Sequence, residues 1–179
     1  MNKGLFMDRD GVINIDYGYV HKTTDFEFID GVFDFTLEAI RKKYLIFIIT
    51  NQAGIGRGFY SINDFNKLTD WMNKKFLDKG VLINKVYFSP YHPIEGKGDY
   101  KKDHISRKPR PGMIEQAKKE FDIDLSKSVL IGDKLTDIEA GKNAGIPTKI
   151  LLTERNKVNI NSELDYTSVD SLYDAKKYL

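Results

Sequence analysis

The chain has 179 residues, of which 41% are hydrophobic and 30% charged, a composition that suits one globular domain, 1–179, with a buried core. Its 28 basic residues nearly balance its 26 acidic residues, so the net charge of +2 gives no electrostatic reason to expect nucleic acid or a membrane as a partner. The absence of cysteine excludes disulfides and thiolate metal sites. Because no secretion signal or membrane-spanning run is recognisable either, we expect a cytoplasmic protein.

Short apolar runs alternate along the chain with helix-length amphipathic segments. Strands are predicted at residues 4–8, 44–50, 85–89, 128–133 and 148–153. Helices are predicted at residues 30–43, 61–80, 111–121, 134–143 and 170–179. Ser61, with an acid three residues later, is typical of a capped helix start, and Asp30 is the expected cap of the first helix. The alternation predicts an α/β fold: a Rossmann-like, doubly wound, mostly parallel sheet of about five to six strands flanked by helices.

Polar residues gather at the ends of the predicted strands. Asp8 and Asp10 follow the first strand, Thr50 ends the second, and Asp133 ends the strand at 128–133. In an open parallel sheet the carboxyl ends of the strands share one edge, where ligands bind. Lys108 comes from the long loop before the third helix and adds a cation to this set. The sequence therefore predicts a site of acids, one hydroxyl and one ammonium group at this edge.

The crowded carboxylates indicate a divalent cation, because oxygen ligands with an open side suit Mg²⁺ and leave room for phosphate oxygens. One carboxylate can then attack phosphorus while the second protonates the departing alcohol and later activates water. Thr50 and Lys108 would bind the phosphoryl oxygens as charge redistributes. A division of labour of this kind explains why Asp8 and Asp10 stand two residues apart.

Four sequence blocks resemble a known family. These blocks are DRDGVIN, IITNQAGIGRGFY, RKPRPGM and IGDKLTDIEAG, which span residues 8–145 in the order typical of the haloacid dehalogenase superfamily of phosphotransferases. Within it they are most similar to the heptose 1,7-bisphosphate phosphatases and the related histidinol-phosphate phosphatases. The resemblance implies that Asp8 is the nucleophile and Asp10 the general acid and base. It also implies that Mg²⁺ is held by Asp8, the backbone carbonyl of Asp10, and Asp133, and that Thr50 and Lys108 stabilise the transferring phosphoryl group.

The resemblance further implies a set of substrate-binding residues, to which Arg57 is added as a cation for a second phosphate. These are Asp16, Tyr17, Gly18, Tyr19, Asn51, Gln52, Arg57, Arg107 and Lys134. Asp137 is interpreted as a supporting residue of the metal site. The glycine-rich run AGIGRG either cradles a phosphate or forms an ordinary turn.

The implied substrate is a small phosphorylated sugar, D-glycero-D-manno-heptose 1,7-bisphosphate, which would lose its 7-phosphate during synthesis of nucleotide-activated heptose for lipopolysaccharide or another surface polysaccharide. Histidinol-phosphate phosphatase is the alternative, because its motifs are nearly the same. A polynucleotide 3′-phosphatase is less favoured, since no aromatic residues interleave the basic run. A non-catalytic binding module is also less favoured, because Asp8, Asp10 and Lys108 are all present.

Many heptose bisphosphate phosphatases carry a zinc loop with three cysteines and one histidine. The positions aligned with those ligands hold Ser89, Tyr91, His104 and Ser106. We therefore expect no structural zinc, because tetrahedral zinc needs four nitrogen, sulfur or carboxylate ligands. One alternative metal set remains in the same loop: His92, Asp99, Asp103 and His104. No large insertion follows the first motif or the second strand, and no long apolar stripe is left unexplained, so a monomer without a separate cap domain is predicted.

Overall fold

In the computed structural model, which describes residues 1–153 and 164–179, six strands form one sheet in the order β3-β2-β1-β4-β5-β6. The strands are β1 (Lys3–Met7), β2 (Tyr44–Asn51), β3 (Lys85–Ser89), β4 (Val129–Gly132), β5 (Thr148–Leu152) and β6 (Thr167–Val169). All five neighbouring pairs are parallel. The predicted parallel α/β sheet is confirmed. The sequence did not reveal β6 as a strand, because its three residues are too few to show a pattern.

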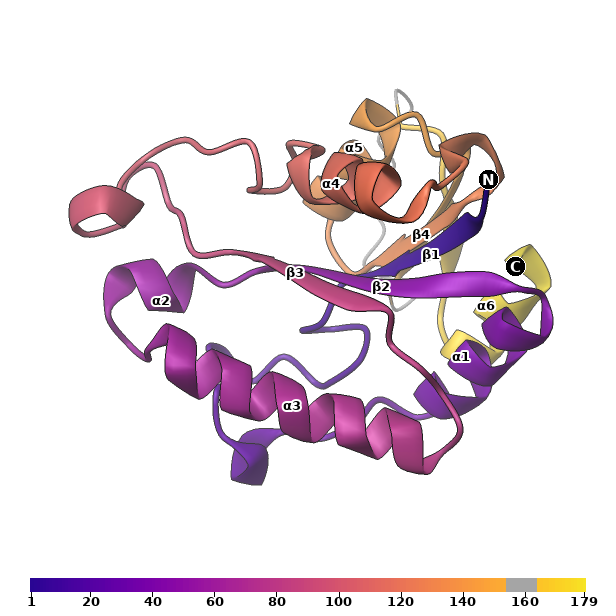
Figure 1. Cartoon of the computed structure of the whole chain (residues 1–179), viewed down its shortest axis with the longest axis horizontal. Coiled ribbons are helices and arrows are strands. Elements are labelled where there is room, and N and C mark those ends of the chain that lie inside the picture. The colour runs from indigo at the N-terminus through magenta and orange to yellow at the C-terminus, as the bar shows by residue number, and fades with distance from the viewer. Residues whose placement is uncertain (154–163) are drawn as a thin grey trace.

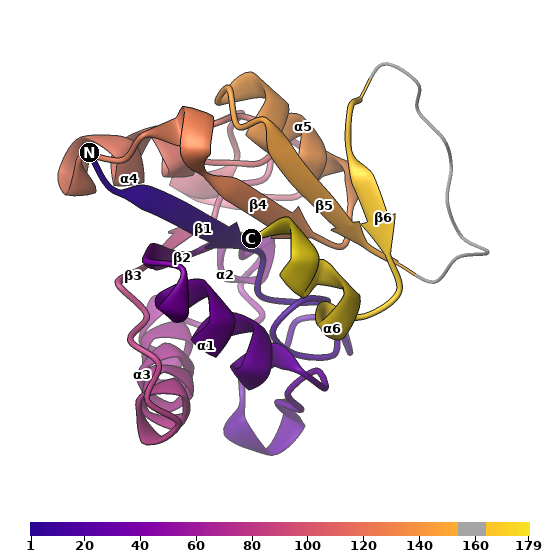
Figure 2. The same cartoon turned by 90° about the vertical axis from the view of Figure 1, so that its right-hand side faces the viewer.

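Helices cover both faces of the sheet, as Figures 1 and 2 show. On one face lie α4 (Gly112–Phe121) and α5 (Leu135–Asn143), and on the other α1 (Val32–Arg41), α3 (Ile62–Asp78) and α6 (Leu172–Ala175). The described residues also form α2 (Ala53–Arg57) and 3-10 turns at Thr23–Asp25, Gly98–Tyr100, Leu125–Lys127 and Lys176–Tyr178. None of the helices in the described part of the chain is long and apolar enough to cross a bilayer.

Successive side chains along each strand enter two different cores. Leu5 and Met7 of β1 pack in the core that contains α1 and α3, whereas Phe6 packs in the core that contains α4 and α5. A strand places alternate side chains on opposite faces, and here both faces are covered. This double burial explains why the strands stand out in the sequence as continuous apolar runs.

The helix boundaries follow from local caps. The predicted capping box of α3 is confirmed: Ser61 Oγ accepts the Asp64 N–H at 3.1 Å, and the Asp64 carboxylate accepts the Ser61 N–H at 2.9 Å. The prediction that Asp30 caps the first helix is wrong, because Gly31 takes the cap position and α1 begins at Val32.

The last helix also starts later than predicted. It begins at Leu172 rather than Asp170, because Ser171 Oγ accepts the Asp174 N–H at 3.1 Å and so caps α6. A 3-10 turn over Lys176–Tyr178 then continues towards the end of the chain. The prediction of helix at 170–179 is therefore correct in type but not in its start.

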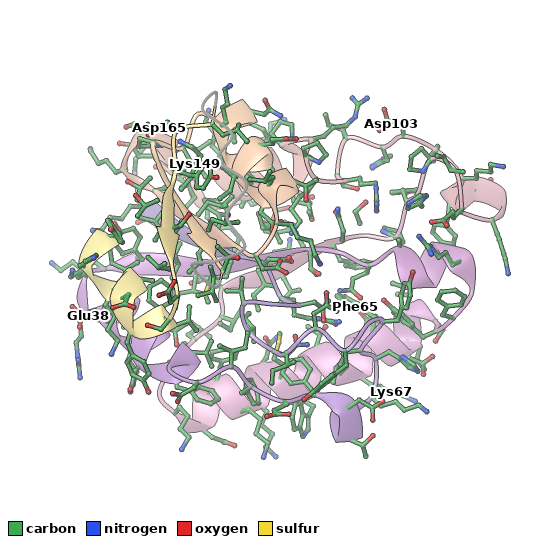
Figure 3. The ribbon with its side chains drawn as sticks, turned by 180° about the vertical axis from the view of Figure 1, so that it is seen from behind. Glu38, Phe65, Lys67, Asp103, Lys149 and Asp165 are labelled. Carbon is green, nitrogen blue, oxygen red and sulfur yellow. The ribbon has the colours of Figure 1, made fainter. Side chains whose placement is uncertain are left out.

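The register of the sheet brings the site residues to one edge. Met7 pairs with Ile48 of β2 and with Ile131 of β4, so Asp8 and Asp133 leave neighbouring strands at nearly the same level. The loop that follows β3 extends past α2, and Asp103 marks it in Figure 3. Lys97 N–H donates to the carbonyl of Gly56 in α2 at 2.8 Å, which docks this loop beside the site edge.

The capping box gives a test of stability that does not touch the site. Replacing Ser61 by alanine removes the side-chain acceptor for the Asp64 N–H, and we expect a loss of about 1 kcal/mol in the free energy of unfolding by urea. Asn63→Ala, in the same helical turn but outside the capping box, should change this free energy by less than about 0.5 kcal/mol. Equal effects of the two substitutions would contradict the role of the cap.

Candidate active site

A cavity of about 350 Å³ opens at the carboxyl edge of the sheet. Most of the predicted site residues line it: Asp8, Asp10, Asp16, Gly18, Tyr19, Thr50, Asn51, Gln52, Arg107, Lys108 and Lys134. The cavity is also lined by Ala53 and Gly54, which begin the glycine-rich run AGIGRG, and by Tyr60 and Thr136, which the sequence did not indicate. Parallel strands and the loops after them therefore bring together residues that are spread over most of the chain.

Two predicted substrate-binding residues lie outside this cavity lining. The Tyr17 hydroxyl donates to the Glu27 carboxylate at 2.6 Å, and its side chain is 61% exposed. Arg57 is engaged by the carboxylate of Glu95 in the loop after β3 and lies over the ring of Tyr19. This geometry does not support a direct substrate contact for either residue, because each side chain is held by a partner outside the lining.

Lys108 is the buried cation at the centre of the site. Its Nζ lies 2.8 Å from Asp8 Oδ1 and 2.6 Å from Asp137 Oδ1, and it donates to the Ile49 carbonyl at 2.8 Å. The Asn51 side chain fixes the backbone of Lys108 from both sides, since it accepts from the Lys108 N–H at 3.0 Å and donates to the Lys108 carbonyl at 3.1 Å. The ammonium group is therefore held between two acids from different elements.

Burial and charge act in opposite directions on this cluster. Burial opposes the charged form of Lys108, but the carboxylates of Asp137 and Asp8 outweigh burial and raise the pKa of Lys108. Burial raises the pKa of the Asp8 carboxyl group; the charge of Lys108 opposes this rise, and that of Asp137 adds to it. Lys108 consequently remains a cation at neutral pH and keeps the acids around it close together.

Three carboxylates form a cluster that could hold a metal ion. Asp8, Asp133 and Asp137 each offer an oxygen, and these oxygens lie within 4.8 Å of one another. Asp133 Oδ1 is buried and has no hydrogen-bond partner among the described residues. Burial, with the charge of Asp8 as the next contribution, raises the pKa of Asp133 to about 7. Hard oxygen donors and a buried oxygen that lacks a partner fit a divalent cation such as Mg²⁺.

Asp137 is already engaged by protein groups. Besides its contact with Lys108, its Oδ2 accepts the backbone N–H of Lys134 at 3.0 Å, which supports its interpretation as a supporting residue. On the other side of the cluster, Gly11 has a φ of 90°, and a Cβ atom there would lie 2.3 Å from Asp133 Oδ2. Only glycine lets the backbone after Asp10 approach Asp133 this closely.

Asp10 is held by a separate set of donors. Arg9 Nη2 lies 2.9 Å from both carboxylate oxygens, Asn14 Nδ2 donates at 3.0 Å, and Gln52 Nε2 donates at 3.0 Å. Arg9 is 1% exposed, and its Nη2 also donates to the Val20 carbonyl at 2.7 Å. No role was predicted for Arg9 or Asn14 from the sequence, although a basic residue between two acids after a buried strand is a usable signal.

The rim of the cavity carries the DYGYV segment. Lys134 Nζ lies 3.0 Å from Asp16 Oδ2, and the Gly18 N–H donates to Asp16 Oδ1 at 3.0 Å. Burial would raise the pKa of Asp16, but these two hydrogen bonds and the charge of Lys134 outweigh it and lower the pKa. Tyr19 packs edge-on against Phe59, with ring centroids 4.8 Å apart. Charged and aromatic groups thus share this side of the mouth.

The four positions aligned with zinc ligands meet in space. Ser106 Oγ donates to Ser89 Oγ at 3.0 Å and lies 2.8 Å from His104 Nδ1. The Tyr91 ring stacks on His104 with centroids 4.0 Å apart, and Arg107 Nη1 donates to the Tyr91 carbonyl at 2.9 Å. Hydrogen bonds and ring stacking therefore join the two ends of the loop after β3, next to Arg107.

The alternative metal set in this loop is not gathered as ligands. In residues 1–153 and 164–179 the acids and histidines of the loop do not form a metal-binding group. Asp103 pairs with Arg110, and the His92 ring faces Glu95 at 3.4 Å. The rival hypothesis built on His92, Asp99, Asp103 and His104 therefore has no geometric support.

Removing the buried cation gives a test of the charge cluster. In Lys108→Met the pKa of Asp8, already raised by burial, should rise further because its acidic neighbours stay in place. A raised pKa in the folded state means that stability falls as pH rises. We expect a loss of about 3–5 kcal/mol in the free energy of unfolding at pH 8 and a smaller loss at pH 5.5, measured by urea unfolding without added metal.

Lys127→Met is the matched control. Lys127 also pairs with an aspartate, Asp124, at 3.0 Å, but its side chain is 72% exposed. An exposed pair of this kind contributes about 0–1 kcal/mol, so the control should unfold nearly as the wild type does at both pH values. A loss in Lys108→Met that is equally small, or independent of pH, would contradict the proposed charge balance.

Known proteins resemble the chain in both sequence and structure. A family model described as HAD-hydrolase-like matches residues 105–175. The D-glycero-alpha-D-manno-heptose-1,7-bisphosphate 7-phosphatase of Burkholderia mallei is 50% identical over 155 residues, which cover 87% of this chain and 82% of the relative. The D-glycero-beta-D-manno-heptose-1,7-bisphosphate 7-phosphatase of Haemophilus influenzae is 42% identical over 181 residues, which cover 100% and 97%.

A solved structure shows the same fold. The crystal structure of D,D-heptose 1,7-bisphosphate phosphatase from B. bronchiseptica, complexed with magnesium and phosphate, matches with a TM-score of 0.82 at 24% identity and covers 98% of this chain and 96% of that one. The family resemblance seen in the four sequence blocks is thereby confirmed. The chain belongs to the haloacid dehalogenase superfamily and, within it, to the family of D-glycero-manno-heptose-1,7-bisphosphate 7-phosphatases.

Proposed function

We propose that the protein is a magnesium-dependent phosphatase that removes the 7-phosphate of D-glycero-D-manno-heptose 1,7-bisphosphate. Family membership makes it a phosphoric monoester hydrolase, and the names of its relatives supply the substrate. The observation that carries the proposal is the meeting of Asp8, Asp133 and Lys108 at the carboxyl edge of the sheet. This arrangement combines a nucleophile, a metal site and a cation for phosphate.

The side chains of Asp8 and Asp133, with the backbone carbonyl of Asp10, would hold the metal ion. The partnerless buried oxygen of Asp133 supports this assignment. When bound, Mg²⁺ supplies positive charge that neutralises and orients the phosphoryl group. Asp137 supports the site through Lys108 rather than as a principal ligand, because both of its oxygens already accept protein donors.

In the first half of the reaction, a carboxylate oxygen of Asp8 forms a bond to phosphorus, and the bond from phosphorus to the sugar oxygen breaks. Asp10 donates its proton to the departing oxygen. The donors from Arg9, Asn14 and Gln52 hold Asp10 at the cavity, where its side chain is 17% exposed. The product of this half is a phosphorylated Asp8 and a free sugar hydroxyl.

In the second half, Asp10 accepts a proton from water, and the water oxygen forms a bond to phosphorus while the bond to Asp8 breaks. Inorganic phosphate leaves and the Asp8 carboxylate is restored. Lys108 and Thr50 stabilise the charge on the phosphoryl oxygens in both halves. Loss of one such preorganised contact costs on the order of 100- to 1000-fold in rate.

The second phosphate of a bisphosphate needs a cation away from Asp8. Arg107 and Lys134 line the same cavity, and Asp16, Gly18 and Tyr19 lie at its rim, where they can contact the sugar. The cavity volume of about 350 Å³ suits a small sugar bisphosphate. Because relatives are named for the alpha and for the beta anomer, the proposal covers both. A place in the synthesis of nucleotide-activated heptose, which the family resemblance implies, stays a prediction.

The substrate is tested by phosphate release from a panel. We expect both heptose 1,7-bisphosphate anomers, or one of them, to exceed histidinol phosphate, fructose 1,6-bisphosphate and a 3′-phosphorylated oligonucleotide by about tenfold or more in kcat/KM, which is about 1.4 kcal/mol of discrimination. Preference for histidinol phosphate would contradict the proposed substrate but not the proposed phosphatase mechanism. No release from any member would reject the phosphatase proposal.

The nucleophile is tested by a change from carboxylate to amide. Asp8→Asn should lower kcat by about 1000-fold or more, because the amide cannot form the phosphorylated intermediate. Asp122→Asn is the matched control, since Asp122 is highly exposed and pairs with the N-terminal amine. Near-normal turnover by folded Asp8→Asn, checked by circular dichroism, would reject the mechanism.

The requirement for Mg²⁺ is tested by chelation, and the role of Asp133 as a ligand is tested by substitution. EDTA should abolish turnover and added Mg²⁺ should restore it. Asp133→Asn should raise the Mg²⁺ concentration needed for half-maximal rate by about tenfold or more, because an amide oxygen is a weaker ligand than a carboxylate. Activity that persists after exhaustive EDTA treatment would remove Mg²⁺ from the proposal.

A further inference from the structure

We propose that Tyr60 is a positioning residue for phosphoryl transfer: its hydroxyl group fixes the side-chain amide of Gln52, which in turn orients both Thr50 and Asp10. Tyr60 carries no role in the reaction described above, although it lines the cavity. The inference deepens the proposed function and rests on it. It also reassigns Gln52, predicted as a substrate-binding residue, to the support of two other side chains.

Three hydrogen bonds meet at the amide of Gln52. The Tyr60 hydroxyl donates to Gln52 Oε1 at 2.5 Å. Gln52 Nε2 donates to Thr50 Oγ1 at 2.7 Å and to Asp10 Oδ2 at 3.0 Å. Gln52 is 2% exposed and Thr50 1%, so water does not compete for these bonds. The amide thus links one residue that would bind the phosphoryl group to another that would transfer the proton.

The chemistry of the three partners leaves one orientation for the amide. The Asp10 carboxylate accepts hydrogen bonds when ionised, so the NH₂ end of Gln52 must face it. Rotation of the amide by 180° would place its oxygen against that carboxylate. The Tyr60 hydroxyl opposes this rotation, because it donates to the oxygen end. Burial raises the pKa of Tyr60 to about 12, so the hydroxyl keeps its proton at neutral pH.

This orientation determines what Thr50 can offer to a substrate. Thr50 Oγ1 accepts a hydrogen bond from Gln52 Nε2, so its own hydroxyl proton stays available for an acceptor in the cavity. A phosphoryl oxygen is such an acceptor. At Asp10, Gln52 contacts Oδ2 while Asn14 contacts Oδ1, so the two donors together resist rotation of the carboxylate.

Local packing is arranged around the Tyr60 ring. A Cβ atom on Gly54 would lie 2.2 Å from the ring, so the helix α2 can approach Tyr60 only with glycine at this position. The His21 ring stacks on Tyr60 with centroids 4.9 Å apart and an interplanar angle of 5°. The glycine-rich run, interpreted from the sequence as a phosphate cradle or an ordinary turn, forms helix α2 over Ala53–Arg57, and its Gly54 packs closely against the Tyr60 ring.

The first test removes the hydroxyl and keeps the ring. With p-nitrophenyl phosphate as the probe, Tyr60→Phe should lower kcat by about 3- to 10-fold, the equivalent of one hydrogen bond, while KM changes by less than about twofold. Tyr87→Phe is the matched control, because the buried Tyr87 donates its hydroxyl to the Glu120 carboxylate at 2.7 Å and does not line the cavity. The control should keep its kcat even where its thermal midpoint falls.

A double-mutant cycle separates positioning from a general loss of structure. In a Gln52→Leu background, Tyr60→Phe should lower kcat by less than about 1.5-fold, because the amide through which it acts is gone. The single and double variants are first compared by thermal unfolding. Effects of the two substitutions that multiply fully, or a Tyr60→Phe enzyme with wild-type kcat, would overturn the proposal.

An NMR measurement keeps this result distinct from failure of the proposed function. If the wild type releases phosphate from no monoester, the proposed function fails, but the network can still be observed in the ¹⁵N-labelled protein. The side-chain NH₂ resonances of Gln52, identified by their loss in Gln52→Leu, should shift in Tyr60→Phe and stay in place in Tyr87→Phe. Unchanged Gln52 resonances in Tyr60→Phe would overturn the proposal by themselves.

Discussion

The rest of the site depends on the ion pairs that the buried ammonium group of Lys108 forms with the acids around it. Without it, the acids that follow β1 and β4 would face one another in the interior, where unpaired charge is strongly destabilising. Its contacts with Asp8 and Asp137 join the end of β1 to α5. Asn51 fixes the backbone that carries it and so ties β2 to the same centre. One cation therefore makes the crowding of acids compatible with folding, while Asp133 Oδ1 has no hydrogen-bond partner among the described residues.

The sequence was sufficient for the site residues that directly follow the strands. Asp8 and Asp133 could be placed together because parallel strands end at one edge, and the strands themselves stood out because both faces of the sheet are buried. Side-chain contacts that depend on the path of a loop could not be predicted. The pairing of Arg57 with Glu95 joins residues 38 positions apart, and Tyr60 reaches Gln52 only because α2 turns the chain back. Neither leaves a periodic signal in the sequence.

The contacts within the loop after β3 could not be predicted from the sequence either. The sequence showed that serine and tyrosine stand at three of the positions aligned with zinc ligands, but not what would hold the loop instead. The side chains at all four aligned positions, Ser89, Tyr91, His104 and Ser106, contact one another through hydrogen bonds and ring stacking. Arg107 lies against this cluster through the Tyr91 carbonyl. The packing of the loop thus determines where a cavity-lining cation stands, which links loop structure to substrate binding.

The two acids at the start of the chain differ through the residue between them. Arg9 donates its backbone N–H to Asp8 Oδ1 at 2.7 Å, while its guanidinium contacts both oxygens of Asp10. Asp8 consequently faces Lys108 and the acids of the candidate metal site. Asp10 instead faces Arg9, Asn14 and Gln52. Identical side chains two residues apart therefore meet different electrostatic surroundings, and the proposed division into a nucleophile and a proton-transferring acid requires such a difference. A basic residue between two acids is, in this position, what separates their surroundings.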